Sequence, residues 1–161
     1  MLKKFGIIIT VVLVIAIVCT GCSGGQSTRP APDAGAQTYV ITGECSALVN
    51  GEVLSVSAVS DIEPGTNGTL SVYSAVGEQL ELIKITQEEK NKPITAEFTI
   101  AEDWPDDVYA FLVFDTDQSD QQSKEIKEKY GKKFQNIVGD NTVWSSNGVA
   151  VVIQSDIVSV H

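Results

Sequence analysis

The arrangement of apolar residues between positions 38 and 161 restricts the fold more than any other feature of this chain. Short runs of Val, Ile, Thr, Ser and aromatic residues are interrupted by Gly, Asn or Pro about every 8–12 positions, a spacing typical of all-β proteins. In the run 94–100 apolar and polar residues alternate, so one strand face would be buried and the other solvated. The run 108–114 is apolar throughout, which indicates a central strand covered on both faces. We predict one antiparallel β-sandwich domain.

Turn residues divide this region into about eight expected strands. Asn50-Gly51 and Asn147-Gly148 each separate two apolar runs, and Asn-Gly favours the type I′ turn of two-residue hairpins. We therefore predict tight hairpins at both places. The expected strands occupy residues 38–48, 52–60, 69–76, 79–86, 93–100, 107–115, 141–145 and 149–159.

One segment of the domain has a helical pattern. Residues 121–131 are rich in good helix formers, and Ile126 and Tyr130 would form a narrow apolar stripe. A capping box beginning at Ser119 and a glycine at Gly131 would mark the two ends of the helix. We predict a short amphipathic helix across a sheet edge or one end of the sandwich.

The first 22 residues carry an unrelated pattern. Two lysines precede an apolar run at 7–18, which suits a secretory signal peptide and is short for a membrane span of about 20 residues. The run ends in Cys-Thr-Gly-Cys, which resembles the lipobox of bacterial lipoproteins, in which two small residues precede a cysteine. The resemblance implies that Cys22 receives a diacylglyceryl group and becomes the new N-terminus after cleavage. Cys19 departs from the family pattern, which usually has Leu or another aliphatic residue there.

This pattern predicts three segments: a lipoprotein signal peptide at 1–21, a lipidated cysteine and flexible tether at 22–37, and the sandwich at 38–161. The tether is rich in Gly, Ser, Pro and Ala, and for 15 residues its r.m.s. reach would be about 20–25 Å. Removal of residues 1–21 would change the net charge from −10 to −12, because two lysines and no acidic residue are lost.

Composition excludes several classes of function. A net charge of −10 is unsuited to nucleic-acid binding, which depends on Lys and Arg neutralising phosphates. The one histidine, His161, leaves no second imidazole for a histidine-rich metal site and no plausible catalytic triad. No glycine-rich nucleotide loop follows a strand, so we predict neither a cofactor nor an enzyme. Once Cys22 is lipidated, Cys45 is the only thiol, and we predict a small buried core residue there and no internal disulfide.

Two further resemblances concern the domain. The sequence WPDDVY at 104–109 resembles the tyrosine corner of immunoglobulin-like sandwiches, with Asp107 where Gly is usual. The order of four segments across residues 38–160 is similar to a class of bacterial lipoprotein domains with an immunoglobulin- or fibronectin-like sandwich and no assigned function. These segments are ITGECSALVNGEVLSVSAVS, IEPGTNGTLSVYSAVGEQL, VYAF and QQSKEIKEKYGKKFQNIVGDN. The resemblance implies an immunoglobulin-like fold of about 7–8 strands with one short helix, at the bacterial surface, and no catalytic residues.

The candidate binding residues are acidic or aromatic. Asp115, Asp117 and Asp120 begin like an EF-hand loop and form a candidate Ca²⁺ site, although Asp120 stands where that motif has Gly. Solvated loop carboxylates are the alternative explanation. Tyr73 and Trp144 are candidates for stacking on a sugar ring, whereas Trp104 is expected to pack in the core or at a corner.

We therefore expect a lipid-anchored, non-enzymatic binding or scaffold domain on the extracytoplasmic face of a bacterial cell membrane, bound to an envelope protein or glycan. The alternative is a carbohydrate- or Ca²⁺-dependent ligand-binding module.

Overall fold

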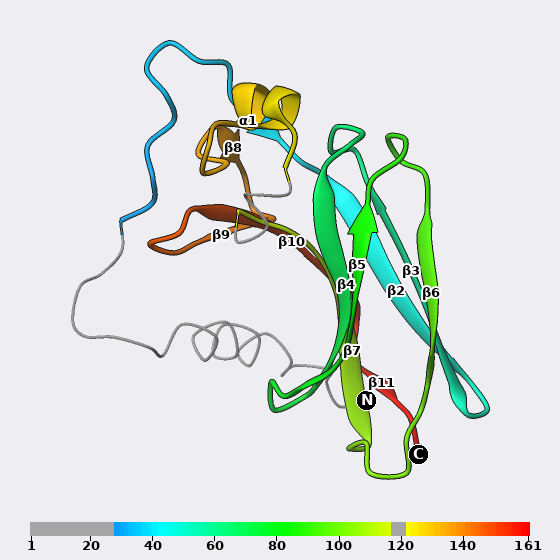
Figure 1. The fold of residues 1–161 in the computed structure, drawn as a ribbon. Helices are drawn as coiled ribbons and strands as arrows, with labels where there is room; N and C mark the ends of the chain where they lie inside the picture. The colour runs from blue at the N-terminus through cyan, green and yellow to red at the C-terminus, as the bar shows by residue number, and fades with distance from the viewer. Residues whose placement is uncertain (1–27, 117–121) are drawn as a thin grey trace, which may run out of the picture.

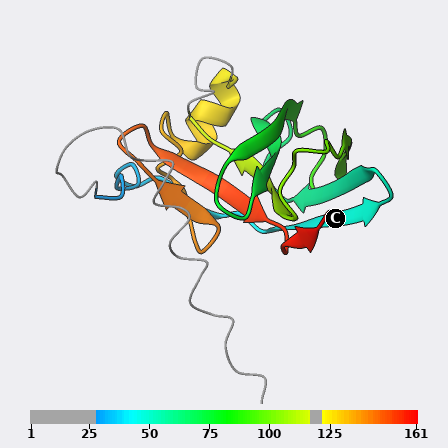
Figure 2. The ribbon, with the colours of Figure 1, turned by 90° about the horizontal axis from the view of Figure 1, so that it is seen from below.

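The computed structural model describes residues 28–116 and 122–161, and two antiparallel sheets packed face to face make up most of this part of the chain (Figure 1 and Figure 2). The predicted all-β sandwich is therefore confirmed. The smaller sheet has the order β2-β3-β6, with bounds Gly43–Asn50, Val53–Ser60 and Ile94–Thr99. The larger sheet has the order β5-β4-β7-β10-β9, with bounds Gln79–Thr86, Asn67–Ser74, Asp107–Phe114, Val149–Gln154 and Thr142–Trp144.

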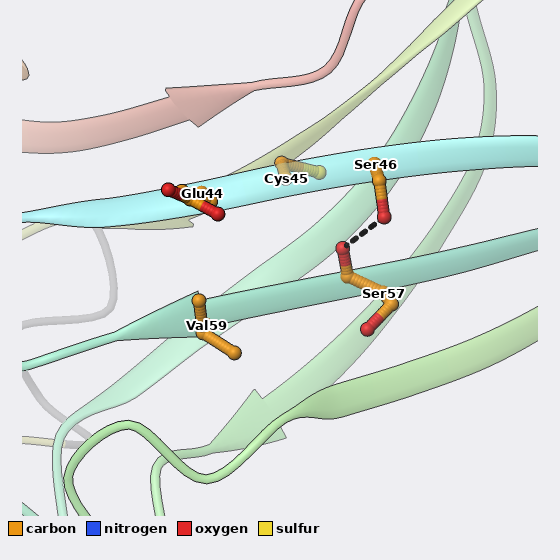
Figure 3. Close-up of a pocket in the computed structure, with 5 residues that line it drawn as sticks. All are labelled: Glu44, Cys45, Ser46, Ser57 and Val59. Atoms are coloured by element: carbon orange, nitrogen blue, oxygen red, sulfur yellow. Dashed lines mark hydrogen bonds between the residues drawn. The ribbon is translucent and has the colours of Figure 1, made fainter.

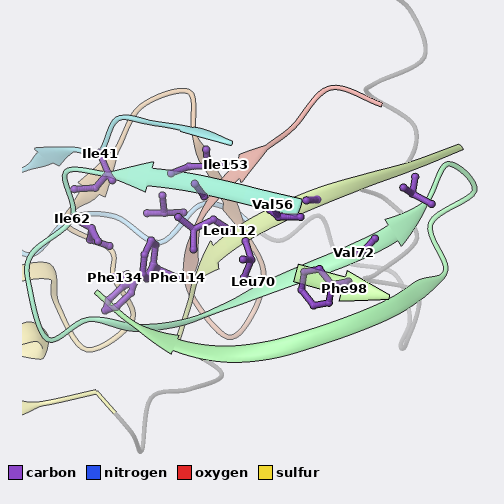
Figure 4. Close-up of a cluster of buried hydrophobic side chains, with 14 of the residues drawn as sticks. Ile41, Val56, Ile62, Leu70, Val72, Phe98, Leu112, Phe114, Phe134 and Ile153 are labelled. Atoms are coloured by element: carbon purple, nitrogen blue, oxygen red, sulfur yellow. The ribbon is translucent and has the colours of Figure 1, made fainter. Parts of the chain in front are cut away.

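The core lies between the two sheets and is built by the inward-facing side chains of their strands (Figure 4). In β7 every second side chain is fully buried, and this strand is paired on both sides, by β4 and β10. Gly68 of β4 faces the Phe114 ring so closely that a Cβ there would lie 2.7 Å from it. The principal core side chains are Leu54, Val56, Leu70, Val72, Phe98, Val108, Leu112, Phe114, Val151 and Ile153.

The last predicted strand, 149–159, is interrupted by a β-bulge. The short strand β11 (Val158–Ser159) also pairs with β7, but its register differs by one residue from that of β10. Ser155 lies at the interruption, where its Oγ accepts a hydrogen bond from the Ala110 backbone N–H at 2.9 Å and its own N–H donates to Ala110 O at 2.9 Å. The Ser155 side chain thus supplies the hydrogen-bond acceptor that the Ala110 N–H needs at the point where the strand has one extra residue.

Residues 115–148, here called the insertion, connect β7 to β10, and their described part from 122 to 148 folds onto one end of the sandwich (Figure 1). They include helix α1 (Lys124–Tyr130), β8 (Ile137–Val138) and β9. The cap of α1 is Ser123, whose side chain accepts from the Ile126 N–H at 3.3 Å, whereas the predicted cap Ser119 lies outside the described residues. Ile126 and Tyr130 are buried and Gly131 has a φ of 84°, as the helical pattern predicts.

Residues 28–40, here called the docked segment, pack against the insertion. β1 (Tyr39–Val40) pairs in parallel with β8, a contact that the predicted single strand 38–48 does not contain. Arg29 Nη2 donates to Ile137 O at 2.6 Å. The Asp33 carboxylate accepts hydrogen bonds from the side chains of Gln135, at 2.9 Å, and Asn136, at 3.2 Å. The second half of the expected tether is thus held by specific contacts.

Candidate functional site

Three aromatic side chains lie together on the outer face of the larger sheet. Tyr73 belongs to β4, and Tyr109 and Phe111 belong to β7. The inward positions of these strands are occupied by core residues such as Val72 and Ala110, so the intervening aromatic residues point away from the core. The strand register places Tyr73 directly opposite Tyr109. We call Tyr73, Tyr109 and Phe111 the outer aromatic cluster.

The rings of this cluster are in mutual contact. Tyr73 and Tyr109 are stacked, with centroids 6.2 Å apart and planes inclined by 15°, and Phe111 meets both rings edge to face at 5.5 and 4.9 Å. The Tyr73 hydroxyl donates to Gln79 Oε1 at 3.0 Å. Burial raises the pKa of both tyrosines above the ordinary value.

Exposed aliphatic side chains accompany the cluster. Leu82 of β5 is 41% exposed and pairs with Ser71, next to Tyr73 along β4. Val76, in the turn after β4, is 77% exposed, and Ile157, at the bulge next to β11, is 57% exposed. Tyr109 is only 3% exposed and Tyr73 and Phe111 are half-buried, so the surface that this sheet offers to a partner consists of the edges of two rings and these aliphatic side chains.

The outer face of the smaller sheet has a different chemistry. Figure 3 shows a shallow depression there, of about 180 Å³, lined by Glu44, Cys45, Ser46, Ser57 and Val59. Ser46 Oγ donates to Ser57 O at 3.2 Å, so the strands satisfy their own polar groups across it. The depression is small and open. None of its side chains pairs a nucleophile with a general base.

Cys45, on the same strand, faces the other sheet. Its Sγ lies 3.9 Å from Ala110 O, and the side chain is partly buried and packs against the core, whereas the sequence predicts a buried core residue. Burial raises the pKa of the Cys45 thiol to about 11. The thiolate, which is the reactive form, is therefore scarce at neutral pH.

The structure separates the two predicted stacking residues. Trp144 lies on β9, and both β7 and β10 lie between it and the strand of Tyr73. Three strand spacings amount to about 14 Å across the sheet, so the two side chains do not form one platform. Trp144 is 44% exposed, and Arg29 lies over its ring at 5.8 Å, whereas Trp104 is buried in the core as expected.

The predicted metal and lipid sites lie largely beyond the described residues. Asp115 is half-buried, whereas Asp117, Asp120 and Cys22 are outside the described ranges. Within 28–116 and 122–161, no three His, Cys, Asp or Glu side chains are grouped as a metal site requires. His161 Nε2 lies 3.1 Å from Trp104 O. No helix in these same ranges is long and apolar enough to cross a membrane.

The outer aromatic cluster corresponds to no single sequence motif, although the parity of its residues along the strands is a signal for it. Tyr109 and Phe111 share one parity in the run 108–114, and Tyr73 is exposed by the alternation of its own strand. Only the pairing of β4 with β7 shows that these positions meet. Comparison with protein-family models, with curated proteins and with solved structures gives no match for this chain.

Proposed function

We propose that this chain is a lipid-anchored bacterial surface protein whose sandwich is a non-enzymatic module that binds an envelope component through the outer aromatic cluster. The lipobox-like sequence ending at Cys22 supports the anchor. Two acyl chains at one cysteine supply the two hydrophobic signals that stable anchoring requires. The extracytoplasmic face of the cell membrane is the corresponding location.

The order of the strands supports an immunoglobulin-like assignment. In such sandwiches strands A, B and E form one sheet, and C′, C, F and G form the other. Assigning β2 through β7 to A, B, C, C′, E and F in chain order, and β10 to G, reproduces both sheets. The tyrosine corner is matched less well, because among the described residues the Tyr109 hydroxyl has no backbone partner and its ring stacks on Tyr73 instead.

The single observation that carries the proposed binding role is the contrast between the two outer faces. The larger sheet presents the half-buried rings of Tyr73 and Phe111 with exposed Leu82 and Val76 nearby, whereas the smaller sheet presents Ser, Thr and Glu and a single exposed leucine, Leu48. Aromatic residues are enriched in binding interfaces because they bury a large area with few rotatable bonds.

Photo-crosslinking on intact cells tests this proposal. A photoreactive amino acid is placed at Tyr73 or, as the matched control, at Ser57 on the polar sheet. We expect an adduct of defined mass from position 73 and none from position 57. Equal yields from both positions, or no adduct from position 73, would contradict the proposal.

A glycan-binding module is the second candidate, and the half-buried ring of Tyr73 favours it, since aromatic rings stack on the apolar faces of sugars. Retention on purified cell-wall glycan is the measurement. Tyr73→Ala should abolish retention, whereas Trp144→Ala, distant on the same sheet, should not.

Membrane fractionation tests the anchor separately. Cys22→Ser should move the protein from the membrane to the soluble fraction if processing still releases residues 1–21, or leave the precursor uncleaved. An unchanged, fully processed membrane-bound form would contradict the lipid anchor.

A further inference from the structure

We infer that the end of the sandwich formed by the insertion and the docked segment lies directly against an anionic phospholipid surface, with Trp144 at the membrane–water interface. This inference rests on the proposed anchor at Cys22 and adds the orientation of the domain and its lipid-contacting surface. It is carried by the course of the chain toward Cys22, by the distribution of charge and by the exposure of Trp144.

The docked segment fixes where the chain leaves the folded domain. Arg29 is bound to Ile137 O, and Asp33 is bound to the side chains of Gln135 and Asn136. Seven residue steps separate Cys22 from Arg29, and even a fully extended chain covers about 3.5 Å per step, or about 25 Å in all. A lipid on Cys22 therefore keeps the insertion end of the sandwich close to the bilayer.

Charge is distributed unevenly between the two ends. Residues 41–114 and 149–161 together carry three basic and 14 acidic side chains. Residues 28–40 and 115–148 together carry six basic and seven acidic side chains, so this end of the chain is nearly neutral. The excess negative charge of the protein thus lies away from the anchored end.

Most cations at this end form no ion pair with a carboxylate of the described residues. Of the nine Lys and Arg residues in the described ranges, Lys90, Lys92, Lys124 and Lys129 form ion pairs with described carboxylates. The other five have no ion pair within those ranges, and four of them belong to the docked segment or the insertion: Arg29, Lys127, Lys132 and Lys133. Only Lys84 lies on the body of the sandwich. Each basic residue near an anionic bilayer contributes about 1 kcal/mol of attraction.

An exposed tryptophan lies among these cations. Trp144 is 44% exposed, Arg29 lies over its ring, and Lys133 Nζ donates to Ser146 O at 3.2 Å in the turn that follows it. Tryptophan is enriched at the membrane–water interface, where its ring meets the acyl boundary and its N–H remains near water. The arrangement therefore fits a lipid surface of negative charge.

Vesicle binding by a chain that starts at residue 22 and carries Cys22→Ser tests the inference without a lipid anchor. The described contacts are all made by residues from Arg29 onward, so this chain contains every one of them. The probes are vesicles of phosphatidylcholine alone and with 30% phosphatidylglycerol. We expect binding to the anionic vesicles only, and a decrease of about 30-fold in partitioning for Lys132→Glu, because this substitution changes the charge by two. Lys84→Glu is the matched control and should bind like the parent chain, with the unfolding midpoint of both variants as the check on folding.

Fluorescence quenching by brominated lipids places the tryptophan. Quenching should be present in the parent chain and lost in Trp144→Phe, in which buried Trp104 is the remaining fluorophore. The inference is overturned by absence of binding to anionic vesicles, by equal effects of Lys132→Glu and Lys84→Glu, or by quenching that survives Trp144→Phe. Because these chains carry no lipid, the result is independent of the Cys22→Ser fractionation that tests the anchor.

Discussion

Replacing Glu63 by glutamine should loosen the attachment of the insertion to the sandwich. Glu63 lies just before β4, and its carboxylate receives Lys129 of α1 in an ion pair and Lys90 at 3.0 Å. Its backbone N–H donates to the Tyr130 hydroxyl at 2.9 Å. Lys129 also lies over the ring of Tyr39, at 5.3 Å, so one carboxylate organises the contact between helix, sandwich and docked segment.

The magnitude follows from the exposure of the partners. The side chains of Glu63 and Lys129 are 32% and 29% exposed, and that of Lys90 is 50% exposed, so solvent screens both pairs in part. Partly exposed ion pairs contribute roughly 0.2–1 kcal/mol each, which gives about 0.5–2 kcal/mol for Glu63→Gln at pH 7. In a domain of this size the melting temperature should fall by roughly 2–8 °C.

The effect should depend on pH in a defined direction. Hydrogen bonds from Lys129 and then Lys90 hold the pKa of Glu63 below its ordinary value. A carboxyl whose pKa is lower in the folded than in the unfolded state stabilises the fold above the unfolded-state pKa, about 4.3. That contribution is lost as the pH falls through the lower, folded-state pKa. Thermal unfolding should be measured at pH 7, at pH 5 and at several values from pH 4 downward. The difference in melting temperature between the parent chain and Glu63→Gln should decrease only at acidic pH.

Glu88→Gln provides the matched control. Glu88 pairs with Lys92 four residues away, and its side chain is 71% exposed, so its removal should have little effect on melting temperature. The reasoning about Glu63 would be refuted by an equal loss in Glu88→Gln, or by a Glu63→Gln difference that stays constant down to pH 3.

Three further predictions concern the sandwich. Ser155→Ala should destabilise the domain by about 1–3 kcal/mol in denaturant titrations, because the buried N–H of Ala110 loses its acceptor; an unchanged midpoint would show that the bulge is satisfied in another way. Gly68→Ala should lower the free energy of unfolding by at least about 1–3 kcal/mol in the same assay, because its Cβ would lie 2.4 Å from Val113 O. An unchanged free energy of unfolding would contradict the close approach of β4 and β7. The Cys45 thiol should react slowly with a disulfide reagent at pH 8 and rapidly in denaturant, because burial raises its pKa to about 11; fast reaction of the native protein would contradict this environment.

The strands were predictable because each carries a local pattern. The alternation at 94–100 and the apolar run at 108–114 correspond to β6 and β7, one at the edge of its sheet and one at the centre. The hairpin at Asn50-Gly51 also forms, but only Gly51 has a positive φ, at 63°, whereas a type I′ turn requires two such residues. Asn50 is paired with Val53 instead, so the loop is shifted by one residue.

The contacts of the insertion were not predictable in the same way. The parallel pairing of β1 with β8 involves only two residues on each strand, too few for any periodic signal. Gly, Ser, Pro and Ala at 23–37 have no pattern of their own, and residues 28–37 are ordered by partners about 100 positions away, such as Asn136. The outer aromatic cluster likewise depends on which strands become neighbours, which alternation within a strand does not reveal.

The connection between β7 and β10 explains how a chain with a net charge of −10 still gathers most of its described cations at one end. Adjacent antiparallel strands need only about two to five connecting residues, whereas here residues 115–148 intervene. Buried side chains of the insertion, including Ile126, Tyr130 and Phe134, belong to the same core cluster as the sandwich, so the insertion is fixed to one end of it. Five of the nine described cations lie within it, and their positions are set by this packing. The net charge therefore limits which partners approach the whole molecule, whereas the topology decides at which end of the sandwich these cations gather.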